Sequence, residues 1–216
     1  MDFYIAALGR SGSTALANWL TTPPTHVVFH EPNLLRSTPT RLLASQLDDW
    51  DMTKEQAMAG HWAVKETSSD MHDDMLAAYA PSKVILCVRN IADAALSLFE
   101  KHRRQEVLDR YSDDWAADYL VREAEGLVRL ARQLENDSVE FAIFRYEEFG
   151  ESSLRKLADW IEWPGGGEMS RGFQAFGRAF EMQRERSRDL TPEMIRLAGD
   201  IAERCAAFDQ RFYGSG

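Results

Sequence analysis

The chain lacks the features that mark a membrane protein or a protein of an oxidising compartment. No apolar stretch among its 216 residues is long enough to span a bilayer. The N-terminus shows no charged flank followed by an apolar segment and a small-residue cleavage site, so we expect no signal peptide. Only two cysteines are present, Cys87 and Cys205, and their apolar surroundings favour reduced core thiols over a disulfide. These absences predict a cytoplasmic protein.

Metal-ligand clusters and an excess of positive charge are also missing. The five histidines are scattered without ligand spacing, which argues against a structural zinc site. The formal net charge of −10 argues against broad nucleic-acid binding, because contact with a phosphate backbone needs a basic surface. A small anionic ligand is compatible with this charge, since it needs only a local basic pocket.

What the chain does contain is an alternation of strand and helix patterns. Strands are predicted over 3–8, 27–30, 61–65, 83–88 and 139–144. Helices are predicted over 13–20, 34–47, 53–59, 69–79, 113–135, 152–161, partly over 168–189, and in two segments capped by Asn90 and by Thr191, the latter running to about Tyr213. With no internal repeat or linker, this order predicts one domain over 1–216. The expected fold class is α/β, a P-loop-like three-layer α/β/α arrangement with a five-stranded, mainly parallel sheet.

The segment "GRSGST" at 9–14 follows the first predicted strand and opens a helix. Gly9 and Gly12 allow a tight turn, after which the amides of residues 11–14 point at an anion on the helix N-terminus. ATP-binding loops of this kind place a lysine beside the second glycine, but position 13 is a serine and the only cation is Arg10. ATP chemistry is therefore disfavoured, whereas a basic residue inside the loop can reach the bridging oxygen of a 5′-linked group.

The stretch "RSGST" resembles the 5′-phosphosulfate loop of the sulfotransferases that use 3′-phosphoadenosine 5′-phosphosulfate (PAPS). Their loop reads Lys or Arg, Ser, Gly, Thr or Ser, Thr. The resemblance implies that the donor PAPS is bound without a metal. Its phosphosulfate would contact Arg10, Ser11, Gly12, Ser13 and Thr14.

A second segment, "KVILCVRNIADAALSLFE" at 83–100, resembles the 3′-phosphate segment of the same family. There an arginine at the end of a strand precedes a serine eight positions later on the next helix, which here are Arg89 and Ser97. Together they would form a charge-assisted clamp on the 3′-phosphate. The alternative is an ion pair between Arg89 and Asp93, with Ser97 on the helix surface.

Further matches assign a catalytic cation and adenine contacts. "AVKETSS" at 63–69 resembles the motif whose lysine, here Lys65, stabilises the transferring sulfuryl group; the alternative is a solvated strand end. "FRYEEF" is similar to a motif whose tyrosine, here Tyr146, lies near the adenine. The family's glycine-rich Arg-Lys motif is not evident, and the Arg-rich stretch "RERSRD" would substitute for it through Arg186 or Arg188, unless it is a solvated helix face.

The acceptor's proton requires a base. Many family members use a histidine where this chain has Thr67, a poor base, whereas carbohydrate-type and bacterial branches use a glutamate after the second strand. "VVFHEPN" resembles the latter and makes Glu31 the first choice, with His30 as its rival and Glu66 as a weaker candidate. The alternative for Glu31 is a surface ion pair or a capping role.

The resemblance implies a sulfotransferase that moves a sulfuryl group from PAPS to a hydroxyl or amine of a small-molecule or carbohydrate acceptor. The alternatives are a P-loop kinase using ATP and magnesium, and a non-catalytic nucleotide-binding module. Segments 33–60, 101–120 and 165–190 are expected to line the acceptor site. The side chains that would either stack on an acceptor or belong to the core are Trp50, Trp62 and Trp115.

Overall fold

A computed structural model describes residues 1–21, 25–30, 59–104, 112–163 and 190–214. Its elements, in chain order, are β1 (Phe3–Ala7), α1 (Ser13–Leu20), β2 (His26–His30), β3 (His61–Glu66), η1 (Ser69–Met71), α4 (His72–Tyr79), β4 (Lys83–Val88), α5 (Ile91–Arg104), α6 (Asp113–Asn136), β5 (Glu140–Arg145), η2 (Tyr146–Glu148), α7 (Glu151–Trp160), α9 (Pro192–Arg204) and α10 (Ala206–Tyr213). The predicted helices over 34–47 and 53–59, apart from residue 59, and the Arg-rich segment 168–189 lie outside the described residues.

The five strands form one sheet in the order β2-β3-β1-β4-β5, and every neighbouring pair is parallel. The predicted five-stranded sheet is thus confirmed, and it is all parallel rather than mainly so. β1 lies in the centre, with β3 on one side and β4 on the other. The connection after β1 leads to β2 at one edge of the sheet, and the connection after β4 leads to β5 at the other edge. The switch point therefore lies between β1 and β4, and ligands of open α/β sheets bind at such a point, beyond the carboxyl ends of the strands.

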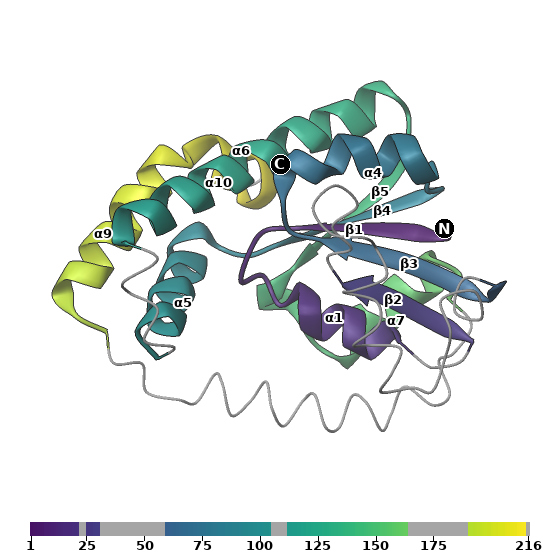
Figure 1. Ribbon diagram of the computed structural model, residues 1–216, viewed down its shortest axis with the longest axis horizontal. Helices are drawn as coiled ribbons and strands as arrows, with labels where there is room; N and C mark the ends of the chain where they lie inside the picture. Colours follow the sequence, from purple (N-terminus) through teal and green to yellow (C-terminus); the bar gives the residue numbers. More distant parts are fainter. Residues whose placement is uncertain (22–24, 31–58, 105–111, 164–189, 215–216) are drawn as a thin grey trace.

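Helices cover both faces of the sheet, as Figure 1 shows. Successive residues of β1 point to opposite faces of the sheet. Tyr4 and Ala6 pack in one core with residues of α4, α5, α6, α9 and α10. Phe3, Ile5 and Ala7 pack in the other core with residues of α1 and α7. All five residues are buried, which explains why this strand reads as a continuous apolar run without alternation. The predicted three-layer α/β/α arrangement is confirmed.

The predicted helix caps are present, but the last helix is not continuous. Asn90 Oδ1 accepts a hydrogen bond from Asp93 N at 3.2 Å, and Thr191 Oγ1 accepts one from Met194 N at 3.3 Å. The prediction of one helix to Tyr213 is wrong, because the backbone turns at Cys205 (φ −100°, ψ 20°), between α9 and α10.

Both cysteines are free and buried, as expected from their apolar surroundings. Burial raises the pKa of the Cys87 thiol to about 12 and that of Cys205 to about 11, so neither is a thiolate at neutral pH. Among the described residues, no helix is long and apolar enough to cross a membrane, and no group of three or more His, Cys, Asp or Glu side chains is placed to hold a metal ion.

Candidate anion-binding site

The loop between β1 and α1 turns through two left-handed residues. Arg10 has φ 69° and Gly12 has φ 79°, and α1 begins directly afterwards at Ser13. The turn is closed by a hydrogen bond from Ser11 N to the Leu8 carbonyl at 3.2 Å. A non-glycine residue such as Arg10 enters the left-handed region at a cost, so this conformation is held by the surrounding contacts.

The donors that this loop offers differ in one respect from those expected. The Ser11 amide holds the turn, and the buried Ser11 hydroxyl donates to Cys87 Sγ at 3.5 Å. The amides of Gly12, Ser13 and Thr14 belong to the first turn of α1, where no intrahelical carbonyl is available to accept from them. These three amides, at the positive end of the helix dipole, are the backbone donors suited to an anion.

The two segments that the sequence assigns to separate phosphates are in direct contact. Arg10 Nε donates to Ser97 Oγ at 3.2 Å, and Arg89 Nη1 donates to the Arg10 carbonyl at 3.2 Å. Arg89 follows β4 and is only 5% exposed, whereas Arg10 is exposed. Partial desolvation lowers the pKa of Arg10, and its interactions with Tyr146 and with Glu100 on α5 oppose that shift. The Arg89 guanidinium therefore contacts the backbone of the loop after β1, and the Arg10 guanidinium of that loop contacts α5.

Tyr146 joins these two segments through its ring. The Arg89 guanidinium carbon lies 4.1 Å from the centre of the Tyr146 ring, a cation–π contact. On the Gly12 side, a Cβ added to the glycine would lie 2.8 Å from Tyr146 Cδ2. Gly12 is therefore required both for its left-handed backbone and for the close approach of the ring.

Sequence reasoning missed the carboxylate next to this tyrosine. Glu147 accepts from the Asn90 amide at 2.9 Å with Oε1 and from the Tyr213 hydroxyl at 2.9 Å with Oε2. Burial, followed by this hydrogen bond, raises the pKa of Tyr213, so the phenol stays protonated and donates. Glu147 thus ties the corner after β4 to the end of α10.

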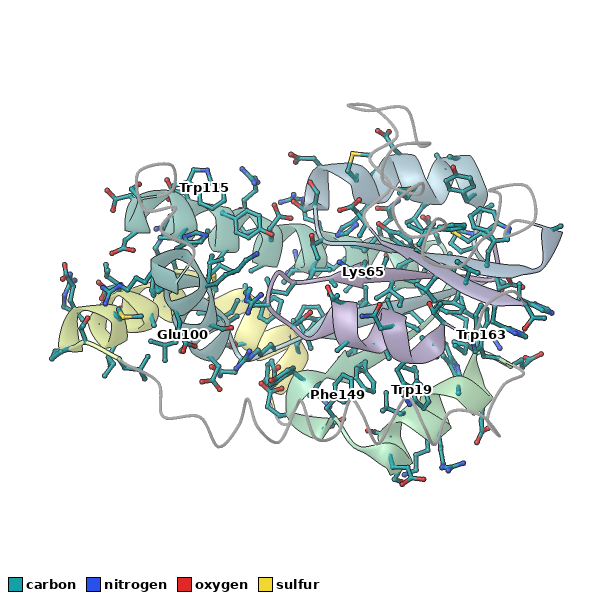
Figure 2. All side chains as sticks on the ribbon, turned by 60° about the horizontal axis from the view of Figure 1, so that its bottom comes forward. Trp19, Lys65, Glu100, Trp115, Phe149 and Trp163 are labelled. Atoms are coloured by element: carbon teal, nitrogen blue, oxygen red, sulfur yellow. The ribbon has the colours of Figure 1, made fainter. Side chains whose placement is uncertain are left out.

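Lys65 lies at the centre of the molecule, as Figure 2 shows. It is 1% exposed, and on the sheet it pairs in register with Ile5 on one side and His30 on the other. The alternative of a solvated strand end is therefore wrong. A buried ammonium at the carboxyl end of β3 is costly unless it is compensated, and such residues concentrate at functional sites.

The loop after Lys65 is held by two buried carboxylates. Glu66 Oε1 accepts from the amides of Thr67 at 2.8 Å and Ser68 at 2.9 Å. Glu123 on α6 accepts from the Ser69 amide with one oxygen, and with the other from Arg122 Nη2 at 3.1 Å. The contacts of Glu66 suit a residue that positions the loop better than one that removes a proton.

Gly126, one turn after Glu123, lets η1 approach α6. A Cβ at this position would lie 2.2 Å from Ser69 Cβ, so Gly126→Ala is expected to lower the free energy of unfolding by about 1–3 kcal/mol through overpacking. Gly199→Ala on α9 is the matched control, because its Cβ meets nothing within 4 Å and alanine favours the helix by up to about 1 kcal/mol. Urea unfolding of both variants measures the difference. Equal stabilities would contradict the close packing of Ser69 on Gly126.

Some predicted site residues cannot be placed. Glu31, Arg186 and Arg188 lie outside the described residues. His30 is the last residue of β2, where its backbone pairs in register with Lys65. The position immediately preceding Glu31 is therefore next to Lys65 on the sheet.

These elements define an α/β protein with a P-loop-like loop at the switch point of a parallel sheet, and the fold is that of sulfotransferases. A sulfotransferase from Alicyclobacillus acidocaldarius superposes with a TM-score of 0.57 at 14% identity, covering 100% of this chain and 96% of the other. Mouse sulfotransferase SULT7A1 complexed with PAP gives 0.56 at 14%, covering 97% and 88%. The sulfotransferase domain of the Synechococcus PCC 7002 olefin synthase gives 0.54 at 16%, covering 93% and 94%.

No family model matches the chain, and no curated protein matches its sequence. At identities of 14–16% the structural likeness concerns the fold. The resemblance to sulfotransferases inferred from the two phosphate segments is thereby confirmed at the level of the fold, over nearly the whole chain.

Proposed function

We propose that this protein transfers a sulfuryl group from PAPS to a hydroxyl or amine of a small-molecule or carbohydrate acceptor. The observation that carries the proposal is the contact of Arg10 with Ser97 and of Arg89 with the Arg10 carbonyl, each at 3.2 Å. A donor with phosphates on both its 5′ and 3′ positions needs two cationic cradles within the length of one nucleotide. The complex of the mouse sulfotransferase with PAP, adenosine 3′,5′-bisphosphate, supports the same ligand class.

In this proposal the loop after β1 holds the 5′-phosphosulfate. The amides of Gly12, Ser13 and Thr14 donate to its oxygens, and Arg10 neutralises charge on the bridging oxygen. Ser11 stabilises the loop and is not available to the ligand, because its hydroxyl donates to Cys87 Sγ and its amide donates to the Leu8 carbonyl.

The end of β4 and the start of α5 hold the 3′-phosphate. Arg89 is fixed in direction by its contacts with Tyr146 and the Arg10 carbonyl, so it loses little freedom on binding. The Ser97 hydroxyl can accept from Arg10 and at the same time donate its own proton to a phosphate oxygen. We assign Tyr146 and Arg186 to the adenine side of the nucleotide.

The transfer step needs an in-line acceptor, cations around the sulfuryl group and one base. The acceptor oxygen or nitrogen forms a bond to sulfur while the bond from sulfur to the 5′-phosphate oxygen breaks, and PAP leaves with that electron pair. Lys65 and Arg10 offset the charge on the sulfuryl and bridging oxygens. Glu31 takes the acceptor's proton, with His30 as the alternative base.

We further propose a cytoplasmic setting, supported by the two cysteines that form no disulfide.

The proposal predicts that PAP stabilises the protein without any metal. At about 100 times its dissociation constant, PAP adds about 2.7 kcal/mol, which for a chain of this size raises the melting temperature by about 5–10 °C. The shift should be the same with EDTA, and Mg-ATP should give less. Differential scanning fluorimetry measures each case.

Two results would replace the proposal with its alternatives. A shift produced by Mg-ATP, abolished by EDTA and absent with PAP, would favour a kinase. A PAP shift without any release of labelled sulfuryl groups from PAPS would favour a non-catalytic nucleotide-binding module.

A further inference from the structure

The last turn of α10 is bound to the segment in which β5 ends and η2 begins. Arg145 Nε donates to the Phe212 carbonyl at 2.8 Å, and the Arg145 guanidinium carbon lies 5.8 Å from the centre of the Tyr213 ring. The Tyr213 hydroxyl donates to Glu147 Oε2 at 2.9 Å. Arg145 and Glu147 are the two chain neighbours of Tyr146. We call the contacts of these two neighbours with the last turn of α10 the α10 junction.

Glu147 connects the α10 junction to the residue that follows Arg89. Its Oε1 accepts from Asn90 N at 2.9 Å, so one carboxylate joins α10 to the corner between β4 and α5. Asn90 in turn caps α5 by accepting from Asp93 N at 3.2 Å, and that helix carries Ser97. Both residues of the proposed 3′-phosphate clamp, Arg89 and Ser97, therefore flank a corner whose backbone is tied to α10.

Tyr146 gives the α10 junction a second connection to the same corner. Its ring centre lies 4.1 Å from the Arg89 guanidinium carbon, and a Cβ added to Gly12 would lie 2.8 Å from the ring. The backbone that positions this ring runs between Arg145 and Glu147, and both of these side chains contact α10. The direction of the Arg89 guanidinium therefore depends on α10 through its ring contact as well as through Asn90.

The fold depends little on the hydrogen bond between Tyr213 and Glu147. α10 is anchored in the core by Phe208 and Phe212, which are 1% and 0% exposed. The Glu147 carboxylate is exposed, so water can replace a donor that is lost from it, and the loss costs little stability. A contact that adds little to stability and yet ends at the proposed nucleotide site is suited to alignment.

We propose that Tyr213 is a positioning residue that acts through Glu147 on Arg89, so that the α10 junction sets the preference for a nucleotide with a 3′-phosphate over one without it. This inference rests on the proposed function. Hydrogen bonds from a guanidinium fork weaken steeply when their angles change, whereas ring contacts with adenine tolerate small displacements. The amides proposed for the 5′-phosphate belong to α1, which packs on the opposite face of the sheet from α10. The α10 junction should therefore affect binding of the 3′-phosphate selectively.

The test compares Tyr213→Phe with Tyr79→Phe, using PAP and adenosine 5′-monophosphate (AMP), which lacks the 3′-phosphate. Tyr213→Phe removes only the hydroxyl that binds Glu147. Tyr79 is the matched control, because it ends α4 shortly before β4 begins, where its ring packs edge-to-face on Trp62 at 5.4 Å. In calorimetry, Tyr213→Phe should weaken PAP binding about three- to ten-fold, the effect of one exposed hydrogen bond to a charged group. Its AMP affinity, and both affinities of Tyr79→Phe, should stay within about two-fold of wild type.

A double-mutant cycle with Arg89→Lys separates positioning from a general effect on the fold. Lysine lacks the planar fork that the α10 junction aligns, so in this background Tyr213→Phe should change PAP affinity by less than about two-fold. Unchanged PAP binding by Tyr213→Phe, an equal loss for PAP and AMP, or the full loss persisting in Arg89→Lys would each overturn the inference. Failure of the proposed function is distinguishable, because the wild-type protein would then bind PAP no more tightly than AMP.

Discussion

Replacing Arg89 with alanine is expected to weaken PAP binding by about 100- to 1,000-fold. Arg89 is 5% exposed, so a 3′-phosphate bound to it as proposed would be shielded from water, and removing one partner of a buried charge pair costs about 2–5 kcal/mol. The substitution also removes two contacts of Arg89 that hold the loop after β1 in place, the cation–π contact with Tyr146 and the hydrogen bond to the Arg10 carbonyl. Isothermal titration calorimetry with PAP measures the loss.

Two further variants show whether the loss is specific. Arg89→Lys keeps the charge but not the planar fork or the stacking on Tyr146, so an intermediate loss of about ten-fold is expected. Arg196→Ala is the matched control on the surface, because the exposed Arg196 guanidinium pairs with Asp200 on α9 at 2.8 Å. Loss of an exposed ion pair of this kind costs little free energy, so the PAP affinity of this variant should stay within about two-fold of wild type. If Arg89→Ala melts normally without ligand and binds PAP as wild type does, the 3′-phosphate assignment is wrong.

The elements that sequence predicted best are those in which local and tertiary signals agree. The run "VILCV" is apolar throughout and lies between Lys83 and Arg89, and β4 covers the predicted range Lys83–Val88. The helix predicted over 13–20 begins and ends as expected, because Gly12 supplies the left-handed turn before it. In such segments burial on both faces leaves little choice of structure.

The end of the chain shows where periodicity fails. The buried residues Ile201, Cys205, Phe208 and Phe212 keep helical spacing through the break between α9 and α10. The Cys205 carbonyl accepts from the amides of Phe208 and Asp209, so the turn between the helices satisfies its own hydrogen bonds. A change of backbone direction that preserves the apolar stripe leaves no signal in the sequence.

The candidate site was predicted only in part, because its supporting contacts join distant segments. The Glu147 carboxylate meets Asn90 from 57 residues away, and Glu123 meets Ser69 from 54 residues away. Glu147 stands inside the recognised "RYEEF" segment but carried no signal of its own. Glu123 did carry one, since a carboxylate between Leu120 and Leu127 on the core-facing stripe of α6 requires a buried partner.

Replacing Lys65 with methionine is expected to lower kcat about 100- to 1,000-fold while PAP affinity changes by less than about three-fold. The size of the effect follows from the loss of one preorganised cation from a water-poor transition state, and methionine fills similar volume without the charge. The ammonium is 1% exposed at the end of β3, so no solvent reorganisation is needed when charge develops on the sulfuryl oxygens. The rate of release of labelled sulfuryl groups from PAPS measures kcat.

Lys83→Met is the matched control for this substitution. Lys83 is the first residue of β4 and so lies at the amino ends of the strands, away from Lys65 near the carboxyl end of β3. Its ammonium donates to the Trp160 carbonyl at 2.6 Å and to Glu162 at 2.8 Å. Its loss should reduce stability modestly and leave kcat unchanged, because the proposed reaction takes place at the carboxyl ends of the strands. If Lys65→Met turned over PAPS as fast as Lys83→Met, the buried lysine would have no catalytic role even in a protein that binds PAP. A selective loss in Lys65→Met, with PAP binding retained, would place the reaction at the carboxyl end of β3.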